Sequence, residues 1–309
     1  MDELKKPSIF EANMVYLSLG FALLYIGYIV QSREVYSGLL ITEYIIILLP
    51  NLLYLKLRGF SLKEVLKLNP INLKQIIYIT LIMIFSYPIA VFLNAVVLII
   101  INNFSDILPT AVPIPTNLLE YFLGMFVIAL APGICEEVMF RGTMKSSYDR
   151  LGYIKSIIIT AVLFGVFHFN IMNLVGPIFL GIILGVLVYK TNSLLASILA
   201  HTLNNGIALT IGFIITKYSN QIDEMANNTP IIPEGTQMLI TLITLGSLAL
   251  ISLGLVYFLL KNIPSYNKSL DINEYTEITF KEEKFKSLKY VPLLIVFVTF
   301  IVLNIQMLF

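Results

Sequence analysis

The sequence predicts an all-α fold, a polytopic bundle of about eight to nine transmembrane spans with a polar site inside the membrane. Hydrophobic residues make up 58% of the 309-residue chain, and charged residues only 13%. Apolar runs of about 20 residues, the length that crosses a bilayer as a helix, recur from one end of the chain to the other. Because no internal repeat or low-complexity tract interrupts this pattern, residues 1–309 are expected to form a single membrane domain.

Nine candidate spans follow one another along the chain. Lys5 and Lys6 precede the first apolar run, which lacks a small-x-small cleavage site and is therefore expected to stay as a span. In Ser61–Leu68 the apolar residues fall on one helical face, which predicts a helix along the cytoplasmic surface. The polar stretch from Asn262 to Ser287 predicts a cytoplasmic linker. The spans are expected at 14–31, 37–57, 75–101, 118–143, 153–169, 173–190, 193–217, 236–261 and 288–308.

The distribution of charge predicts the orientation and excludes one class of partner. Basic residues concentrate on alternate loops, which places the N-terminus in the cytoplasm. Lys plus Arg (20) nearly equals Asp plus Glu (19), so no basic field is available for nucleic acid. The expected surroundings are a lipid bilayer, and richness in Tyr, Ile, Lys and Asn suggests a bacterial cell membrane. The lone Cys135 excludes an internal disulfide, and the oligomeric state stays open.

The fourth span carries the most unusual polar group of the chain. Glu136 and Glu137 lie side by side at the end of a long apolar run, with Arg141 one helical turn later. Glu137 and Arg141 are i and i+4 neighbours that can pair, whereas Glu136 points about 100° away and keeps its carboxylate available. Ionisable groups inside the membrane indicate a functional site by default. The alternative to a functional site is a charge cluster at the end of the helix, whose side chains extend to the aqueous interface.

The only two histidines of the chain also lie in apolar segments. His168 follows Phe164 by four residues, and His201 shares a helical face with Asn205. Counted from the nearest basic residue at about 1.5 Å per residue, Glu136, His168, His201 and Asn205 lie about 14, 20, 16 and 22 Å deep. Three helices therefore offer a carboxylate, two imidazoles and an amide near mid-bilayer. Packed histidines and interhelical hydrogen bonds remain the alternative explanation.

These motifs resemble those of a known family. Glu136-Glu137-x-x-x-Arg141, Phe164-x-x-x-His168 and His201-x-x-x-Asn205, in this order, are similar to the motifs of the CAAX-protease and bacteriocin-processing (CPBP, Abi) family of intramembrane proteases. The resemblance covers roughly residues 118–217, with 1–117 and 218–309 as accessory spans. It implies an endopeptidase of the glutamate type that hydrolyses a peptide bond of a membrane-associated protein or peptide.

The resemblance also implies a role for each residue. Glu136 would activate a water molecule held also by His168, while His201 with Asn205 would stabilise the oxyanion. Glu137 and Arg141 would support the site, and no cofactor is expected. Water must reach such a site, so we expect a polar cavity that opens to the cytoplasm between the fourth, fifth and seventh spans.

Several alternatives stay open beside this hypothesis. Two histidines and a glutamate could ligate zinc, although no His-Glu-x-x-His motif is present. Aspartyl chemistry fits less well because Asp106 and Asp149 fall in loops, and no serine lies in a nucleophile motif. A non-enzymatic scaffold or partner-binding regulator could use the same fold. A proton-coupled transporter is disfavoured by the absence of inverted repeats.

Overall fold

The computed structural model describes residues 6–102, 105, 113–219, 234–266 and 287–309, which contain helices and no strand. Eight of the described helices are long and apolar enough to cross a membrane, which confirms the polytopic all-α prediction. The helices are α1 (Ile9–Ala22), α2 (Tyr28–Arg33), α3 (Val35–Leu40), α4 (Leu49–Leu57), α5 (Leu62–Val65), α6 (Leu73–Asn102), α7 (Leu118–Gly124), α8 (Ala131–Glu137), α9 (Lys145–Tyr148), α10 (Tyr153–Val166), α11 (Val175–Thr191), α12 (Leu194–Lys217), α14 (Glu234–Asn262) and α15 (Val291–Leu308).

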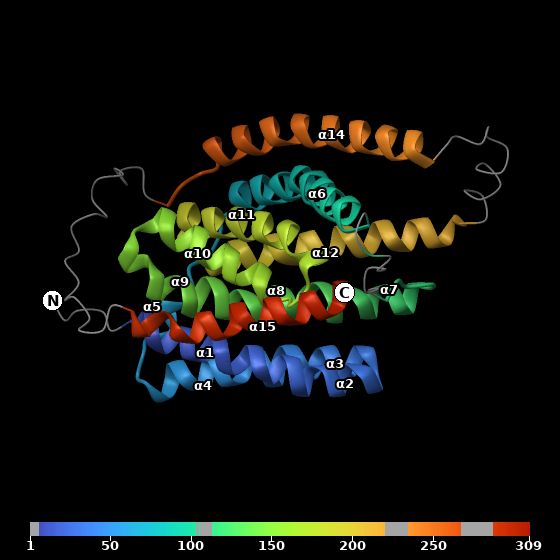
Figure 1. Cartoon of the computed structure of the whole chain (residues 1–309). Coiled ribbons are helices and arrows are strands. Elements are labelled where there is room, and N and C mark those ends of the chain that lie inside the picture. The colour runs from blue at the N-terminus through green and yellow to red at the C-terminus, as the bar shows by residue number, and fades with distance from the viewer. Residues whose placement is uncertain (1–5, 103–104, 106–112, 220–233, 267–286) are drawn as a thin grey trace.

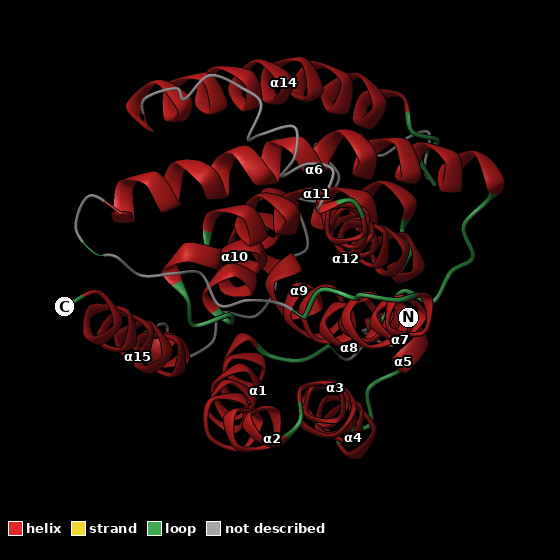
Figure 2. Ribbon diagram, turned by 90° about the vertical axis from the view of Figure 1, so that its right-hand side faces the viewer, coloured by secondary structure: helices red, strands yellow, loops and turns green. Residues whose placement is uncertain are grey.

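The long helices run roughly along one common axis (Figure 1). Seen from the end, α1 to α4 lie on one side and α6 and α14 on the other, with α8, α10, α11 and α12 between them (Figure 2). α14 is outermost and packs against α6, while α15 lies beside α1. The segment predicted to carry the site therefore occupies the middle of the bundle, where neighbouring helices shield its polar groups from lipid.

Four segments inside the spans are π-helical, namely Leu23–Gly27, Ile41–Leu48, Met125–Leu130 and Val138–Met144. The last two flank α8, so the helix that carries Glu136 and Glu137 has widened turns on both sides. Such segments are rare and occur frequently at functional sites, because they shift side chains away from the regular helical positions.

The first and fourth spans are longer than expected. The first helix begins at Ile9, where Ser8 and Glu11 form a reciprocal capping box that satisfies backbone groups of the first turn. The fourth continues to Leu151, eight residues beyond the predicted end. Most of the expected polar linker, residues 267–286, lies outside the described residues.

The expected surface helix over Ser61–Leu68 is only partly formed. The structure has a single helical turn, α5, capped by Ser61. Val65 and Leu66 are buried, and a Cβ at Gly142 would lie 2.3 Å from Leu66 Cδ2. This segment is therefore attached to the bundle through its apolar side chains and is too short to form an extended surface helix.

The prediction of a fifth span over residues 153–169 is wrong, and the difference affects the site. α10 has 14 residues and is about 21 Å long, shorter than the ~30 Å hydrocarbon core. The chain turns after Val166, and α11 begins at Val175, so His168 lies at the tip of a helical hairpin. Gly181 allows the two helices of this hairpin to approach closely, because a Cβ there would lie 2.8 Å from Ala161 Cα.

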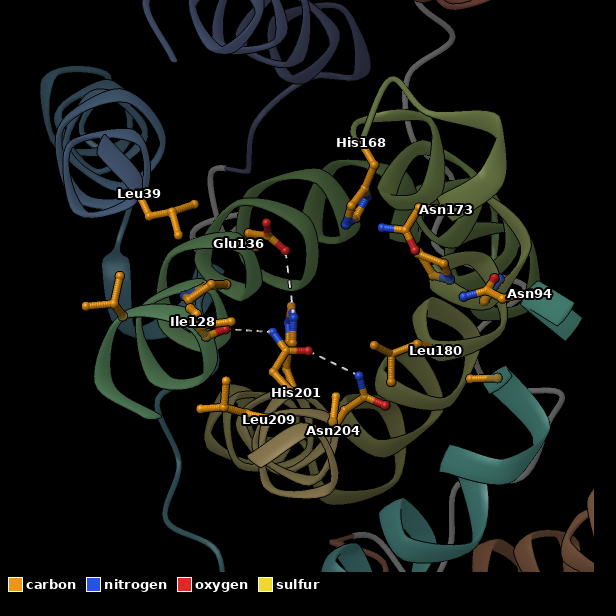
Figure 3. Close-up of a pocket in the computed structure, with 18 of the residues that line it drawn as sticks. Leu39, Asn94, Ile128, Glu136, His168, Asn173, Leu180, His201, Asn204 and Leu209 are labelled. Atoms are coloured by element: carbon orange, nitrogen blue, oxygen red, sulfur yellow. Dashed lines mark hydrogen bonds and ion pairs between the residues drawn. The ribbon is translucent and has the colours of Figure 1, made fainter. Parts of the chain in front are cut away.

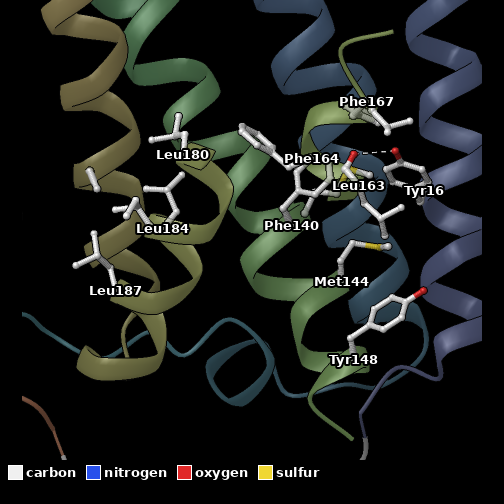
Figure 4. Close-up of a cluster of buried hydrophobic side chains, with 14 of the residues drawn as sticks. Tyr16, Phe140, Met144, Tyr148, Leu163, Phe164, Phe167, Leu180, Leu184 and Leu187 are labelled. Atoms are coloured by element: carbon white, nitrogen blue, oxygen red, sulfur yellow. Dashed lines mark hydrogen bonds between the residues drawn. The ribbon is translucent and has the colours of Figure 1, made fainter. Parts of the chain in front are cut away.

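Aromatic side chains hold this hairpin against the fourth span (Figure 4). The Phe140 ring lies 5.1 Å from that of Phe164 and 5.3 Å from that of Phe167, in edge-to-face arrangements. Tyr16 of α1 packs on the Phe140 and Phe167 rings and donates a hydrogen bond of 2.8 Å to the carbonyl oxygen of Leu163. The buried cluster therefore holds α10 beside the helix that carries the paired glutamates.

Candidate active site

The two helices with the largest number of predicted site residues, α8 and α12, pack against each other at very short range. Gly133 makes this possible, because a Cβ at that position would lie 2.3 Å from Thr202 Oγ1 and 3.1 Å from Thr202 N. A larger side chain there would require Thr202 to shift. The close approach brings Glu137 of α8 within hydrogen-bond distance of His201 of α12.

Glu137 and Arg141 form the ion pair that their spacing predicts. Arg141 Nη1 donates to Glu137 Oε1 at 2.7 Å, and both side chains are fully buried. Arg141 Nη2 also donates to the Gly181 carbonyl at 3.3 Å, and the guanidinium carbon lies 4.5 Å from the centre of the Phe164 ring. The arginine thus connects the fourth span to both helices of the α10–α11 hairpin.

His201 lies between the two glutamates. Its Nδ1 is 2.9 Å from Glu137 Oε1, and its Nε2 is 3.8 Å from Glu136 Oε2. A carboxylate accepts hydrogen bonds, so Nδ1 carries a proton and donates it to Glu137. The Nε2 atom therefore faces Glu136, and it carries a proton only when the ring is a full imidazolium.

The tautomer of His168 follows from its hydrogen bond. Its Nδ1 lies 3.0 Å from the carbonyl oxygen of Phe164, which can only accept. Nδ1 is thus the protonated nitrogen of the neutral ring, and Nε2 carries a free lone pair. Because His168 is one of the cavity-lining residues, that lone pair suits a water molecule as hydrogen-bond donor.

Asn205 is tied to the fourth span as well. Its Nδ2 donates to the Ile128 carbonyl at 3.1 Å, and its Oδ1 accepts from Asn204 Nδ2 at 3.1 Å (Figure 3). Ile128 belongs to the π-helical segment that precedes α8. An amide nitrogen has two N–H groups, so one remains to donate into the cavity.

All four predicted catalytic residues line a single cavity of about 730 Å³. Glu136, His168 and His201 surround its central space in Figure 3, and Asn205 lines it beside Asn204. Glu137 and Arg141 lie behind this wall, paired with each other and fully buried. The four residues come from three different parts of the sequence, and the structure brings all of them together.

The cavity was expected to open at the end of the bundle with the basic loops, but it extends toward the opposite end. Its walls reach Gln31 and Val35 at the turn between α2 and α3, Ile114 before α7, and Gly212 near the end of α12. The short α10 is consistent with this direction, since it lies toward the end of the bundle where the predicted basic loops lie (Figure 1). The expectation of an opening toward the basic loops is therefore wrong in direction.

Glu43 is a cavity residue that the sequence analysis missed. It lies in the π-helical segment Ile41–Leu48, is 4% exposed, and its Oε2 has no hydrogen-bond partner among the described residues. Its carboxylate lies close enough to Glu136 for the two groups to interact electrostatically. The signal was present, because a single glutamate within the apolar second span is itself an intramembrane charge.

The donor arrangement does not form a metal cluster. Among the described residues no group of three His, Cys, Asp or Glu side chains converges as a metal site requires. His201 Nδ1 is occupied by Glu137, and His168 Nδ1 by a backbone carbonyl. Each histidine keeps only its Nε2 atom for any other partner.

The comparison with protein families supports the resemblance inferred from the motifs. Residues 118–207 match the family model described as "Rce1-like: Type II CAAX prenyl endopeptidase Rce1-like". The matched segment contains Glu136, Glu137, Arg141, His168, His201 and Asn205. Searches of curated proteins and of solved structures returned no match. This segment of the chain is thus CAAX-protease-like, and the protein is an integral membrane protein.

Proposed function

We propose that this protein is an intramembrane endopeptidase of the glutamate type, which hydrolyses a peptide bond of a membrane-associated protein or peptide. The observation that carries the proposal is the convergence of Glu136, His168, His201 and Asn205 on one cavity inside a helical bundle. The family match over residues 118–207 supports the same reaction class. A scaffold would not need these four side chains to line a shared cavity.

In the proposed mechanism Glu136 is the general base. Its side chain is 13% exposed and lines the cavity, and Arg141 pairs with Glu137 and not with it. Glu136 removes a proton from a water molecule that also donates to Nε2 of His168. The hydroxide then attacks the scissile carbonyl carbon. General base catalysis of this kind contributes typically ~10²–10⁴-fold to the rate.

The attack produces a tetrahedral intermediate with an oxyanion that needs donors already in position. The Nε2–H group of a protonated His201 and the second N–H of Asn205 supply them from one face of α12. With His201 protonated, the carboxylates of Glu136 and Glu137 are matched by two cations, Arg141 and His201. Glu136 next gives its proton to the leaving nitrogen, and the C–N bond breaks to yield a carboxylic acid and an amine.

Our proposal includes no metal and no other cofactor. It is supported by the arrangement of the described residues, in which no group of three His, Cys, Asp or Glu side chains converges as a metal site requires. A zinc mechanism would require a third ligand close to both Nε2 atoms. Activity that survives exhaustive chelation with EDTA would support the metal-free mechanism, and activity restored only by added zinc would overturn it.

The proposed setting is a bacterial cell membrane with the N-terminus in the cytoplasm. The support for this orientation is the concentration of basic residues at one end of the bundle.

The experiment that tests the function compares membrane and secreted peptides from cells with the wild-type protein and cells with Glu136→Gln, at matched expression. Glutamine keeps the size of the side chain and removes the base. Glu120→Gln is the matched control, because Glu120 belongs to the same span and is not a cavity-lining residue. We expect defined new peptide termini with the wild type and with Glu120→Gln, and none with Glu136→Gln.

Identical peptide sets in all three strains would contradict the proposal and favour the scaffold hypothesis. Termini that persist in Glu136→Gln but vanish in a strain without the protein would show that Glu136 is not the base. If the expected termini do appear, the same data identify the substrate and the cleaved bond.

A further inference from the structure

The side of the membrane from which the cavity is reached can be derived from two independent features. The first is the position of its walls along the helix axes. On α12, His201 lies about 10 Å from the first residue of the helix, while the lining residue Gly212 lies about 27 Å from it. Lining residues Gln31 and Val35 flank the turn at the same far end. Among the described residues the cavity therefore runs from mid-depth to one end only.

The reason for this asymmetry is the hairpin of α10 and α11. It starts and ends beside the helix ends at Leu151 and Leu194, and its tip, with His168, stays inside the bundle. The cavity is surrounded by α3, α6, α11, α12 and the segment before α8, with His168 at the hairpin tip on its wall (Figure 3). Glu136 and His201 lie at the inner limit of this space.

The second feature is the distribution of basic residues over the two ends of the bundle. At the end with the cavity, the described chain has only Arg33 and Lys217. Excess Lys and Arg in short loops marks the cytoplasmic side. The opposite end has Lys6, Lys56, Arg58, Lys63, Lys67, Lys74, Lys145, Arg150, Lys155, Lys190, Lys261 and Lys289.

Together these features lead to one conclusion about access. We propose that the cavity is entered from the non-cytoplasmic side of the membrane, so that the substrate is a translocated peptide or an outward-facing segment of a membrane protein. That the occupant of the cavity is a substrate rests on the proposed function. The direction of access is argued from geometry and charge alone. A cytosolic C-terminal segment would have to enter from the opposite end of the bundle, toward which the described walls of the cavity do not extend.

The chemistry of the wall fits such a peptide. The lining includes the amides of Gln31, Asn94, Asn173 and Asn204, together with the carboxylates of Glu43 and Glu136, and among the described residues it includes no Lys or Arg. Amide side chains can hydrogen-bond the backbone of an extended chain. The wall between them is apolar, with Leu39, Val127 and Leu209. A cavity of about 730 Å³ lies within the usual range of ligand sites, ~300–1,000 Å³.

The test measures the access of water and does not depend on catalysis. The protein has one cysteine, so Cys135→Ala provides a background for single-cysteine variants. Ala208→Cys reports on the cavity, because Ala208 is exposed and lines it. Ile211→Cys is the matched control on the same helix, because Ile211 is 40% exposed but does not line the cavity. Ser32→Cys and Lys63→Cys mark the two ends of the bundle, since both residues are exposed.

Intact cells are treated with a membrane-impermeant, sulfonated maleimide, and the same reagent is then applied to permeabilised cells. We expect Ser32→Cys and Ala208→Cys to react in intact cells, and Lys63→Cys only after permeabilisation. Because the thiolate is the reacting species and forms in water, Ala208→Cys should react at least about tenfold faster than the lipid-facing Ile211→Cys.

Two results would overturn the inference. Labelling of Ala208→Cys only after permeabilisation would place the entrance in the cytoplasm, and labelling from neither side would show that water does not reach the cavity from outside. Addition of Glu136→Gln should leave the labelling pattern unchanged. A protein without proteolytic activity could therefore still show outward access, and an active protease could still show inward access, so the two proposals fail separately.

Discussion

Nδ1 of His201 lies 2.9 Å from Oε1 of Glu137, and the same carboxylate oxygen accepts from Arg141 Nη1 at 2.7 Å. This contact connects two spans that are 64 residues apart in the chain. It determines which nitrogen of His201 faces the cavity and explains why two adjacent glutamates can have different roles. Glu137 holds the histidine and the arginine, and Glu136 remains available for chemistry.

Glu136→Gln and Glu137→Gln should therefore separate activity from stability. Glu137→Gln leaves the fully buried Arg141 without a counter-charge, a change that typically costs ~3–5 kcal/mol. Glu136→Gln removes a carboxylate that faces the cavity, and should abolish processing with little change in stability. Thermal unfolding of the purified proteins in detergent, measured beside processing in cells, checks both outcomes. Equal losses of stability in the two variants would contradict the division of roles.

Gly133→Ala should separate α8 from α12. The new methyl group would lie 2.3 Å from Thr202 Oγ1, and overpacking of this kind costs typically ~1–3 kcal/mol. We expect a lower melting temperature and slower processing, since Glu137 and His201 would no longer meet at hydrogen-bond distance. Gly254→Ala in α14 is the matched control, because a methyl group at that position would have no neighbouring atom within 4 Å among the described residues. A wild-type melting curve for Gly133→Ala would show that the contact is not required.

Asn205→Leu should lower the rate of the chemical step, because it replaces an oxyanion donor with an apolar side chain of similar size. Loss of one such donor typically lowers kcat ~10²–10³-fold. Asn204→Leu provides the comparison, since Asn204 lines the same cavity and hydrogen-bonds Asn205 but is not proposed as a donor to the oxyanion. Kinetics on a peptide identified from the comparison with Glu136→Gln should show the loss in kcat rather than in KM. A larger effect of Asn204→Leu would assign the donor to that residue.

Glu43→Gln should stabilise the protein and slow its reaction. Glu43 is 4% exposed and has an unpartnered oxygen among the described residues, and a buried polar group without a partner is unfavourable, most of all when it is charged. Gain of stability with loss of activity is the usual result when a strained site residue is replaced. Melting temperature and processing rate, each compared with wild type, test this. If Glu43 has no part in the reaction, the nearly isosteric glutamine should leave the processing rate unchanged.

Lys67 should make the stability depend on pH. It lies between α5 and α6, outside the spans, and burial lowers its pKa from 10.5 to about 8, with Lys145 lowering it further and Asp149 opposing the change. Between pH 8 and 10.5 the unfolded chain therefore binds more protons at this lysine than the folded protein. The free energy of unfolding should thus rise with pH across this window, by an amount of order 2–3 kcal/mol.

The measurement is the melting temperature of the wild type and of Lys67→Met from pH 7 to 10.5. Methionine keeps a flexible chain of similar length and removes the charge. The difference between the two proteins isolates Lys67 from the titration of other groups. We expect Lys67→Met to be the more stable protein at pH 7 and the advantage to shrink toward pH 10.5. A constant difference over the whole range would show that Lys67 titrates with its ordinary pKa.

Much of the fold could be predicted from local properties of the chain. Hydrophobicity over about 20 residues places most of the spans within a few residues of their observed bounds, because each membrane helix must satisfy its backbone within itself. The pairing of Glu137 with Arg141 follows from helical spacing alone. The common depth of Glu136, His168, His201 and Asn205 likewise follows from residue counts, and all four do line one cavity.

Only the tertiary structure decided how these groups are used. The tautomers of His168 and His201 depend on a turn and on an interhelical contact, and the position of Glu43 beside Glu136 depends on the packing of the second span against α8. The direction of the cavity depends on the short α10, where hydropathy alone predicts a full span over residues 153–169. Helical periodicity is local information, whereas contacts between helices depend on which side chains fit together at short range, as Gly133 and Thr202 do.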